Sequence, residues 1–334
     1  MSWNVLGHEW AETLLKQHIA KGQVRHAYLL TGPAGVGRRT LAVRFAQALN
    51  CEQPLAPGEP CGVCRICRQI ERMQHADLSV VEAEVMGGTL KVDQVRELQH
   101  SLSLTAYEAN YRVALLLRFE EAHLSAQNAL LKTLEEPADR VILLLTADSA
   151  ENLLPTIVSR CEVLRLRPLS VERLMAALQQ GWQMPLEEAR LLAHLSSGRT
   201  GKALFYHQHP EALESRREWV EDFFRLLDSS LRERMVYADS FRKKEREEIR
   251  EIYRVWLSLW RDVLLAASGA EAPLINLEKE SAIRAVAGSV GAHAGYACAA
   301  GMEQGLQRLD QNLNRQLLTE VLLMDWPRVQ GVKA

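Results

Sequence analysis

The chain has 334 residues, of which 47% are hydrophobic and 25% charged, and its formal net charge is −2. This length predicts two or three domains of ordinary globular composition. The near-zero charge argues against a protein that coats nucleic acid through bulk charge alone. No apolar run is long enough to span a membrane, and the N-terminal MSWNVLGHEWAETLLKQ lacks the basic-then-apolar pattern of a secretion signal. We therefore expect a cytoplasmic protein without membrane contact.

The first distinctive segment is a glycine-rich loop within residues 27–40, AYLLTGPAGVGRRT. An apolar strand runs into Gly32, Gly35 and Gly37, and a helical pattern follows. This is the layout of a loop whose backbone N–H groups hold phosphates at a helix N-terminus. The alternative is a loop that only starts a helix.

Two positions of this loop depart from a working nucleotide site. Arg38 stands where the phosphate-binding lysine is expected, and Arg39 stands where a Ser or Thr would bind magnesium. A guanidinium is a planar fork and not a compact ammonium. Thr40 comes one residue late, so its hydroxyl points about 100° around the helix from the metal position. We expect little or no ATP hydrolysis by this chain, and binding of ATP or ADP stays open.

Four of the six cysteines lie in one segment, CEQPLAPGEPCGVCRICRQ. Cys51, Cys61, Cys64 and Cys67 form two overlapping C-x-x-C steps with a fourth thiol upstream, and the Pro and Gly residues between them allow turns. Four thiolates suit a closed, structural zinc site. The alternatives are an iron–sulfur cluster or a redox dithiol, but nothing nearby suggests electron transfer and a dithiol needs only two cysteines. We therefore predict zinc, with the remaining two cysteines as small core residues.

The following segments alternate between strand and helix patterns, which predicts a parallel sheet covered on both faces. Ser125 is the expected N-cap of the third helix and Pro137 its stop. The expected strands are His26–Thr31, Leu78–Glu82, Val113–Arg118, Val141–Thr146 and Glu162–Leu166, and the expected helices lie near 38–49, 92–104 and 125–136.

After Pro168 the strand patterns disappear. Residues 170–208 predict two or three short helices with breaks at Gly181, Pro185 and Gly198, and nearly everything from Glu211 onward is compatible with helix. The fold class is therefore α/β plus all-α. The predicted domains are 1–167, which contains the cysteine module 51–67, then 168–208 and 209–334.

Two acidic residues, Glu120 and Glu121, end the third strand in VALLLRFEEAHLS. In ATPases of this layout one acid at this point helps to hold magnesium and the next polarises the attacking water. Acids at the start of a helix are also favoured by its dipole, so the pair alone is a weak signal. It gains weight from its place between the glycine loop and the segment NALLKTLEEP.

The segments NALLKTLEEP and LLPTIVSRC resemble the clamp-loader subunits of bacterial DNA polymerase III, a family of AAA+ proteins. The cysteine module after the first helix is similar to that of the delta-prime and gamma/tau types. The altered loop favours the delta-prime type. So does Gly201 in SSGRTGKAL, because motor subunits place an arginine at this position.

The resemblance implies an AAA+ ATPase-like core, a helical lid and a helical collar. It also implies a pentameric assembly with gamma/tau and delta subunits that opens a sliding clamp and sets it on primed DNA. Arg160, in Ser159-Arg160-Cys161, matches an arginine finger that acts in trans on a neighbour's ATP. The alternative for Arg160 is an ion pair at the start of a strand. Thr146 matches the first-sensor position, where we expect ordinary strand-end hydrogen bonding.

Three other functions stay open. An ATP-hydrolysing gamma/tau-type motor would need lysine and threonine at positions 38 and 39. A free-standing phosphotransferase would need an intact loop and its own base, and would not need the Ser-Arg-Cys motif. A zinc-dependent nucleic-acid binder would use Arg65, Arg68 and Arg72 beside the cysteines, but the segment has no interleaved aromatic residues.

Overall fold

The computed structural model describes residues 3–85, 87–103, 107–309, 311 and 313–331. The chain divides into two compact units. The core unit comprises Met1–Leu169 together with Arg199–Lys202, and the helical unit comprises Ser170–Gly198 together with Ala203–Ala334. Within the described residues, no helix is both long and apolar enough to cross a membrane.

A five-stranded sheet with the order β2-β3-β4-β1-β5 forms the centre of the core unit, and every pairing is parallel. The register places Leu29 opposite Leu145 and Val163. All five predicted strands are confirmed, with ends shifted by one or two residues. They are β1 (Ala27–Thr31), β2 (Leu78–Val81), β3 (Arg112–Leu116), β4 (Val141–Ala147) and β5 (Glu162–Arg165).

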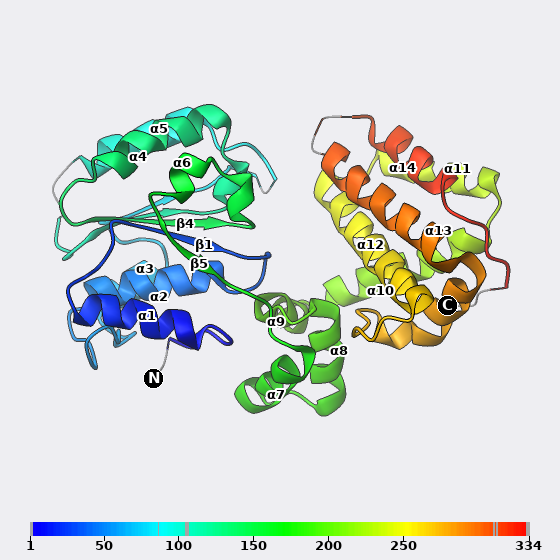
Figure 1. Ribbon diagram of the computed structural model, residues 1–334, viewed down its shortest axis with the longest axis horizontal. Coiled ribbons are helices and arrows are strands. Elements are labelled where there is room, and N and C mark those ends of the chain that lie inside the picture. The colour runs from blue at the N-terminus through cyan, green and yellow to red at the C-terminus, as the bar shows by residue number, and fades with distance from the viewer. Residues whose placement is uncertain (1–2, 86, 104–106, 310, 312, 332–334) are drawn as a thin grey trace. The chain divides into compact units, whose positions relative to one another are not determined.

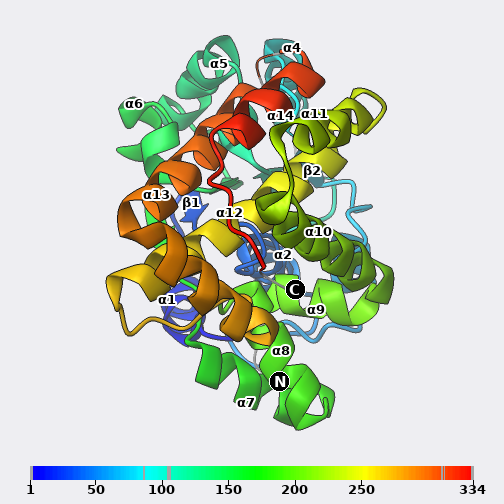
Figure 2. The ribbon, with the colours of Figure 1, turned by 90° about the vertical axis from the view of Figure 1, so that its right-hand side faces the viewer.

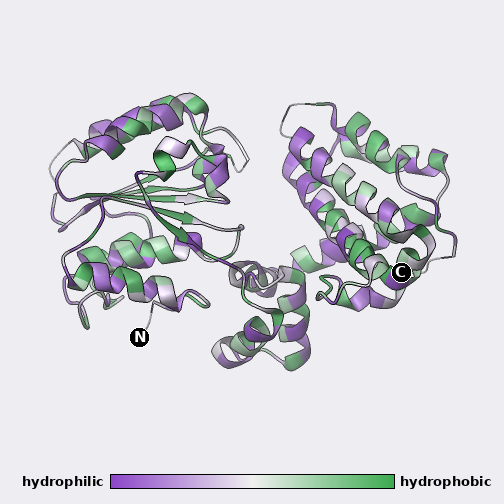
Figure 3. Cartoon of the chain, viewed as in Figure 1, coloured by the Kyte–Doolittle hydropathy of each residue, from purple (hydrophilic) through white to green (hydrophobic). Residues whose placement is uncertain are grey.

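The central strands are apolar on both faces because helices cover both sides of the sheet. Every residue of β1 and β4 is buried, whereas the edge strands β2 and β5 keep partly exposed positions. Figure 3 shows this apolar centre of the core unit. Because the strands are parallel, their carboxyl ends meet at one edge, where α/β proteins of this kind bind ligands.

The helices of the core unit form two layers, with α1, α2 and α3 on one face of the sheet and α4, α5 and α6 on the other (Figure 1). The three predicted helices are present. α5 begins one residue before Ser125, and its N-cap is His123, so the predicted cap is wrong. The bounds are α1 (Glu9–Ala20), α2 (Arg38–Asn50), α3 (Arg65–Glu71), α4 (Val92–Leu102), α5 (Leu124–Glu135) and α6 (Pro155–Val158), with short 3-10 turns η1 (Phe119–Glu121) and η2 (Ala150–Asn152).

The helical unit contains α7 (Val171–Trp182), α8 (Leu186–Ser196), most of α9 (Thr200–Gln208), α10 (Pro210–Asp228), α11 (Leu231–Asp239), α12 (Arg246–Ser268), α13 (Glu280–Leu309) and α14 (Arg315–Met324), with η3 (Ser240–Arg242) and η4 (Leu277–Lys279). Figure 2 shows α10 to α14 packed as a bundle. Aromatic residues dominate its core: Phe223, Trp256 and Trp260 are fully buried, and Trp326 packs against all three.

The predicted breaks in this region hold only in part. α7 continues through Gly181 and ends at Trp182, and the next residue, Gln183, adopts a left-handed conformation with φ of 55°, so the predicted break at Gly181 is wrong. Pro185 and Ser197 flank α8. The start of α9 belongs to the core unit, whereas α7 and α8 belong to the helical unit. A separate domain at 168–208 therefore stays a prediction.

Candidate functional site

The glycine loop lies at the carboxyl edge of the sheet between β1 and α2, as predicted. The Gly32 N–H donates to the carbonyl oxygen of Ala147 at 3.2 Å, and a Cβ at Gly32 would lie 2.3 Å from the carbonyl oxygen of Leu166. Its φ is 142°, and Gly37, the N-cap of α2, has φ of 111°. The first glycine is thus required by close backbone packing with or without a bound phosphate.

Arg38, at the lysine position, pairs with the acid that follows β3. Its Nη1 lies 3.7 Å from Oε1 of Glu120, and the two side chains are only 10% and 16% exposed. Burial lowers the pKa of Arg38 and raises the pKa of Glu120, and each charge partly opposes the shift of the other. Arg38 Nη1 and Glu120 Oε2 have no hydrogen-bond partner among the described residues. The two groups that would serve a phosphate and a magnesium ion thus neutralise each other.

The two residues after Arg38 offer no replacement for the missing magnesium ligand. Arg39 and Thr40 are both exposed. Arg39 lines an open hollow of about 560 Å³ beside β2 and α4. In the described part of the chain, Arg39 forms no ion pair with Glu120 or Glu121.

Glu121 is held by Arg118, a residue that the sequence analysis missed. Arg118 has φ of 48°, and its Nε donates to Glu121 Oε1 at 3.0 Å while its Nη1 donates to Glu82 Oε2 at 3.1 Å. Its backbone N–H donates to the hydroxyl of Thr146 at 2.9 Å. Thr146 therefore makes the strand-end hydrogen bond expected of it. No sequence pattern signals a left-handed arginine, so this network could be found only in the structure.

Gly201 lies against the glycine loop. Its N–H donates to the carbonyl oxygen of Gly35 at 2.8 Å, and a Cβ at position 201 would approach that oxygen to 2.9 Å. An arginine at this position would push the start of α9 away from the loop. Glycine here thus permits direct contact between the loop and α9.

Arg160 lies in the short segment between α6, which ends at Val158, and β5. Its Nη2 is 2.8 Å from Oε1 of Glu135, the last residue of α5, and its Nη1 donates to the carbonyl oxygen of Thr156 at 2.9 Å. The side chain of Arg160 remains 35% exposed. The ion pair considered from the sequence therefore exists, and part of the guanidinium is still accessible to another molecule.

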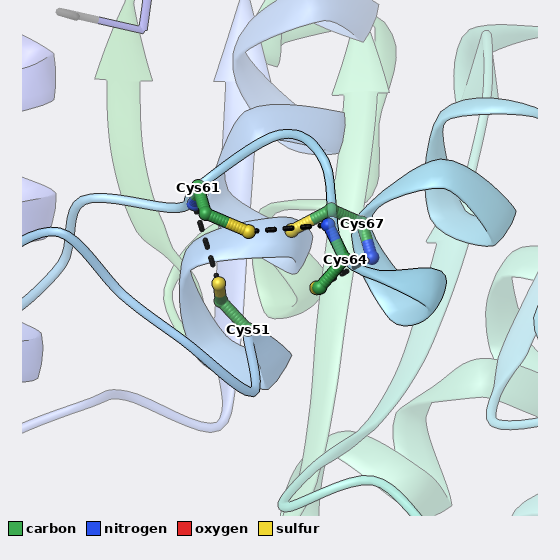
Figure 4. Close-up of side chains that lie close together, drawn as sticks. All are labelled: Cys51, Cys61, Cys64 and Cys67. Carbon is green, nitrogen blue, oxygen red and sulfur yellow. Dashed lines mark hydrogen bonds between the residues drawn. The ribbon is translucent and has the colours of Figure 1, made fainter.

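The four predicted metal ligands converge. The sulfur atoms of Cys51, Cys61, Cys64 and Cys67 all lie within 4.8 Å of one another, and none is in a disulfide (Figure 4). Thiolates bound to one tetrahedral zinc at about 2.3 Å lie roughly 3.8 Å apart, so the cluster is close to what a single ion requires. These four residues can hold a metal ion.

Backbone N–H groups support the thiolate form of this cluster. The N–H groups of Cys61, Cys64 and Cys67 donate to the sulfur atoms of Cys51, Cys61 and Cys64 at 3.3, 3.2 and 3.4 Å. Burial raises the pKa of Cys51 and of Cys67. At Cys61 burial acts in the same direction, but N–H donors from Val63 and Cys64 outweigh it and lower the pKa to about 7. Hydrogen bonds of this kind stabilise charged sulfur.

Side chains from the segment before α1, from α1 and from α2 contact the cysteine module, and these contacts were not predicted. Trp3 Nε1 donates to the carbonyl oxygen of Gly58 at 3.0 Å, and Lys16 Nζ lies 2.6 Å from Glu59 Oε1. Gln47 Nε2 donates to the carbonyl oxygen of Cys67 at 2.8 Å. The module is thus anchored to the core unit on both sides of the cluster.

Known proteins are similar to this chain over different lengths. A family model described as DNA polymerase III, delta subunit, matches residues 7–170. DNA polymerase III subunit delta' of Pseudomonas aeruginosa is 34% identical over 96% of this chain and 98% of its own length. Its counterpart from Bacillus subtilis is 29% identical over 93% of each chain. The tau subunit of Escherichia coli is 36% identical, but over only 53% of this chain and 27% of its own length.

The match to a delta' subunit over 96% of this chain favours that type over the tau type, whose match covers only 53% of the chain. The altered loop, the paired Arg38 and Glu120, and Gly201 agree with that assignment. The chain belongs to the delta' family of DNA polymerase III, a family of AAA+ clamp-loader subunits.

Proposed function

We propose that this chain is a non-hydrolysing subunit of a clamp loader and supplies Arg160 in trans to the ATP of a neighbouring subunit. Its partners would be gamma/tau and delta subunits, the sliding clamp and primed DNA, in the bacterial cytoplasm where replication takes place. The observation that carries this proposal is the contrast between two arginines. Arg38 is buried against the chain's own acid, whereas Arg160 is partly exposed.

The pairing of Arg38 with Glu120 argues against hydrolysis by this chain. Phosphoryl transfer needs a cation that binds the phosphates and an acid that binds magnesium. Here Arg38 and Glu120, which hold these two positions, form an ion pair with each other. The exposed Arg39 adds no metal ligand, because arginine has only donor groups. A motor of the gamma/tau type would need these residues free, so this alternative is disfavoured.

Arg160 keeps donor groups that an arginine finger needs. A guanidinium carries five N–H donors, and the contacts with Glu135, Thr156 and the hydroxyl of Ser159 leave Nε–H and a second N–H on Nη2 for a phosphate. A finger of this kind neutralises charge on the transferring phosphoryl group and increases its rate by about 10³–10⁵.

The decisive experiment compares Arg160→Ala with Arg38→Ala in a reconstituted clamp loader. We expect Arg160→Ala to leave assembly intact and to remove the part of ATP hydrolysis that comes from one site. Clamp loading on primed DNA should fall by a larger fraction than ATP hydrolysis. Arg38→Ala should leave ATP hydrolysis by the assembly unchanged. Arg165→Ala, which removes an exposed arginine of β5, is the matched control. Loss of loading with Arg38→Ala, together with full activity of Arg160→Ala, would show that the chain uses its own nucleotide.

We further propose that the cysteine cluster holds one structural zinc ion. A complete set of four thiolates leaves no open position for a substrate, and zinc favours this tetrahedral sulfur geometry. The ion would hold residues 51–67 in place and would take no part in ATP chemistry.

For the rest of the chain we propose a lid at 168–208 and an oligomerisation collar at 209–334. The support comes from α14, which is apolar on two sides. Leu318, Leu322 and Leu323 are buried, while Leu317, Val321 and Met324 are 58%, 45% and 56% exposed. A helix that is apolar all round is normally buried, so the exposed side suits contact with another subunit.

A further inference from the structure

We infer that Glu135 is a positioning residue for Arg160 and remains paired with it while the guanidinium acts on the neighbour's nucleotide. This inference rests on the function proposed above. Glu135 lies at the end of the segment NALLKTLEEP, and neither the motif nor the sheet topology alone assigns it a role. What assigns it is the contact of 2.8 Å between its Oε1 and Nη2 of Arg160.

Two groups from different elements fix the guanidinium. Glu135, at the end of α5, holds Nη2, and the carbonyl oxygen of Thr156, in α6, accepts from Nη1 at 2.9 Å. The two contacts set both the position and the plane of the fork. A fixed guanidinium loses less conformational freedom when it binds a phosphate than a freely rotating one. The side chain is still 35% exposed, so part of the guanidinium can be reached from solvent.

The place of Glu135 is electrostatically unfavourable without a nearby cation. It is the last residue of α5, and Glu136 follows it directly, so two carboxylates lie at the negative end of the helix dipole. Arg160 compensates this charge. The pair is 35% and 51% exposed, and ion pairs this open contribute little to stability. Stability therefore does not account for an acid at this position, whereas orientation of Arg160 does.

A positioning role for Glu135 can be distinguished from an inhibitory role, in which Glu135 would keep Arg160 away from the phosphate. If Glu135 only competed with the phosphate, its removal would free Arg160 and increase turnover. If Glu135 positions Arg160, its removal leaves a mobile side chain and turnover falls. Removal of residues that orient an active group typically costs about 10–100-fold, as measured for the outer ligands of metal sites.

The experiment measures ATP turnover by the reconstituted loader, and the rate lost with Arg160→Ala defines the finger-dependent part. We expect Glu135→Ala to lower kcat of this part about tenfold with little change in KM for ATP. Glu135→Gln, which keeps a hydrogen-bond acceptor, should lie between Glu135→Ala and the unmodified chain. In the Arg160→Ala background, Glu135→Ala should cause no further loss, because it acts only through that arginine.

Arg44 and Glu71 provide a matched control. Their ion pair of 2.9 Å, with side chains 29% and 53% exposed, has nearly the same geometry and exposure in the same unit. Glu71→Ala should leave turnover unchanged, and both glutamate variants should keep their thermal midpoint within about 2 °C. Unchanged or increased finger-dependent turnover with Glu135→Ala would overturn the positioning role while leaving the finger intact. If Arg160→Ala itself caused no loss of ATP turnover, the proposed function and this inference would both be wrong.

Discussion

Arg38 shows what can be predicted at the scale of single residues. The sequence identifies it as a departure from the phosphate-binding lysine and identifies Glu120 as an acid at the end of a strand. It does not show that they meet, because the strands that precede them, β1 and β3, are separated by β4 in the sheet. The same holds for Arg160 and Glu135, whose contact depends on how α6 packs against α5. The sequence therefore identifies the single residues of each pair, whereas their contacts can be seen only in the folded structure.

The buried pair leads to a prediction about pH. Arg38→Met should lower the free energy of unfolding by about 3 kcal/mol at pH 7.5, since Glu120 is left as a buried carboxylate without a partner. The pKa of Glu120, already raised by burial, should rise further. A carboxyl whose pKa is higher in the folded state favours folding at low pH and loses that contribution as the pH rises through the folded value.

Chemical denaturation at pH 5 and pH 7.5 provides the measurement. The destabilisation by Arg38→Met should be less than half as large at the lower pH. Arg39→Met, which removes an exposed arginine, should have little effect at either pH. An equal loss at both pH values would show that Glu120 does not depend on Arg38 for its charge.

At the scale of elements, the sequence predicted those segments whose signals are strong and local. The strands are continuous apolar runs, and α2, α4 and α5 follow the helical period. α1 and α3 were missed for identifiable reasons. The N-cap His8 of α1 makes no side-chain capping bond, and α3 has only 7 residues and is capped by the sulfur of Cys64. His123 caps α5 through its ring nitrogen, which is not a usual capping group.

The cysteine module gives the prediction at this scale. The purified chain should contain one zinc ion, and Cys64→Ser should lose it, since three thiolates bind the ion less tightly than four. Hydrogen exchange should then increase in residues 51–67 and much less in the sheet. Cys161→Ser, which changes a cysteine outside the cluster, should retain the metal. Iron in place of zinc, or no metal in the unmodified chain, would contradict the assignment.

At the scale of the whole molecule, the division into two units separates the candidate site residues from the surface that we propose for assembly. The altered loop, the cysteine cluster and Arg160 all belong to the core unit, whereas the exposed apolar side of α14 belongs to the helical unit. The sequence predicted helices throughout the C-terminal region, but not which face of α14 is left exposed, because Leu317 and Leu318 are equally apolar in the sequence. Packing of α14 against α11, α13 and η3 distinguishes them.

The exposed stripe predicts where assembly can be weakened without loss of folding. Val321→Asp places a charge on the exposed side of α14, so the isolated chain should remain folded while its affinity for the other loader subunits falls tenfold or more. Size-exclusion chromatography and binding titrations measure the loss. Val63→Asp, at an exposed position of the cysteine module, is the control and should assemble normally. Full affinity of Val321→Asp would exclude this face from the interface.

Arg234, in α11, sets the order in which the helical unit can be completed during synthesis. Its buried guanidinium donates to the carbonyl oxygens of Leu226 and Leu227 at the end of α10, and to those of Leu323, Trp326 and Pro327. The last three are made 89 to 93 residues after the arginine. A ribosome must therefore add 93 residues after Arg234 before this charge can reach all of these acceptors. The contacts of Arg234 with α14 and with the segment after it can therefore form only once that segment has been made, well after α11 itself.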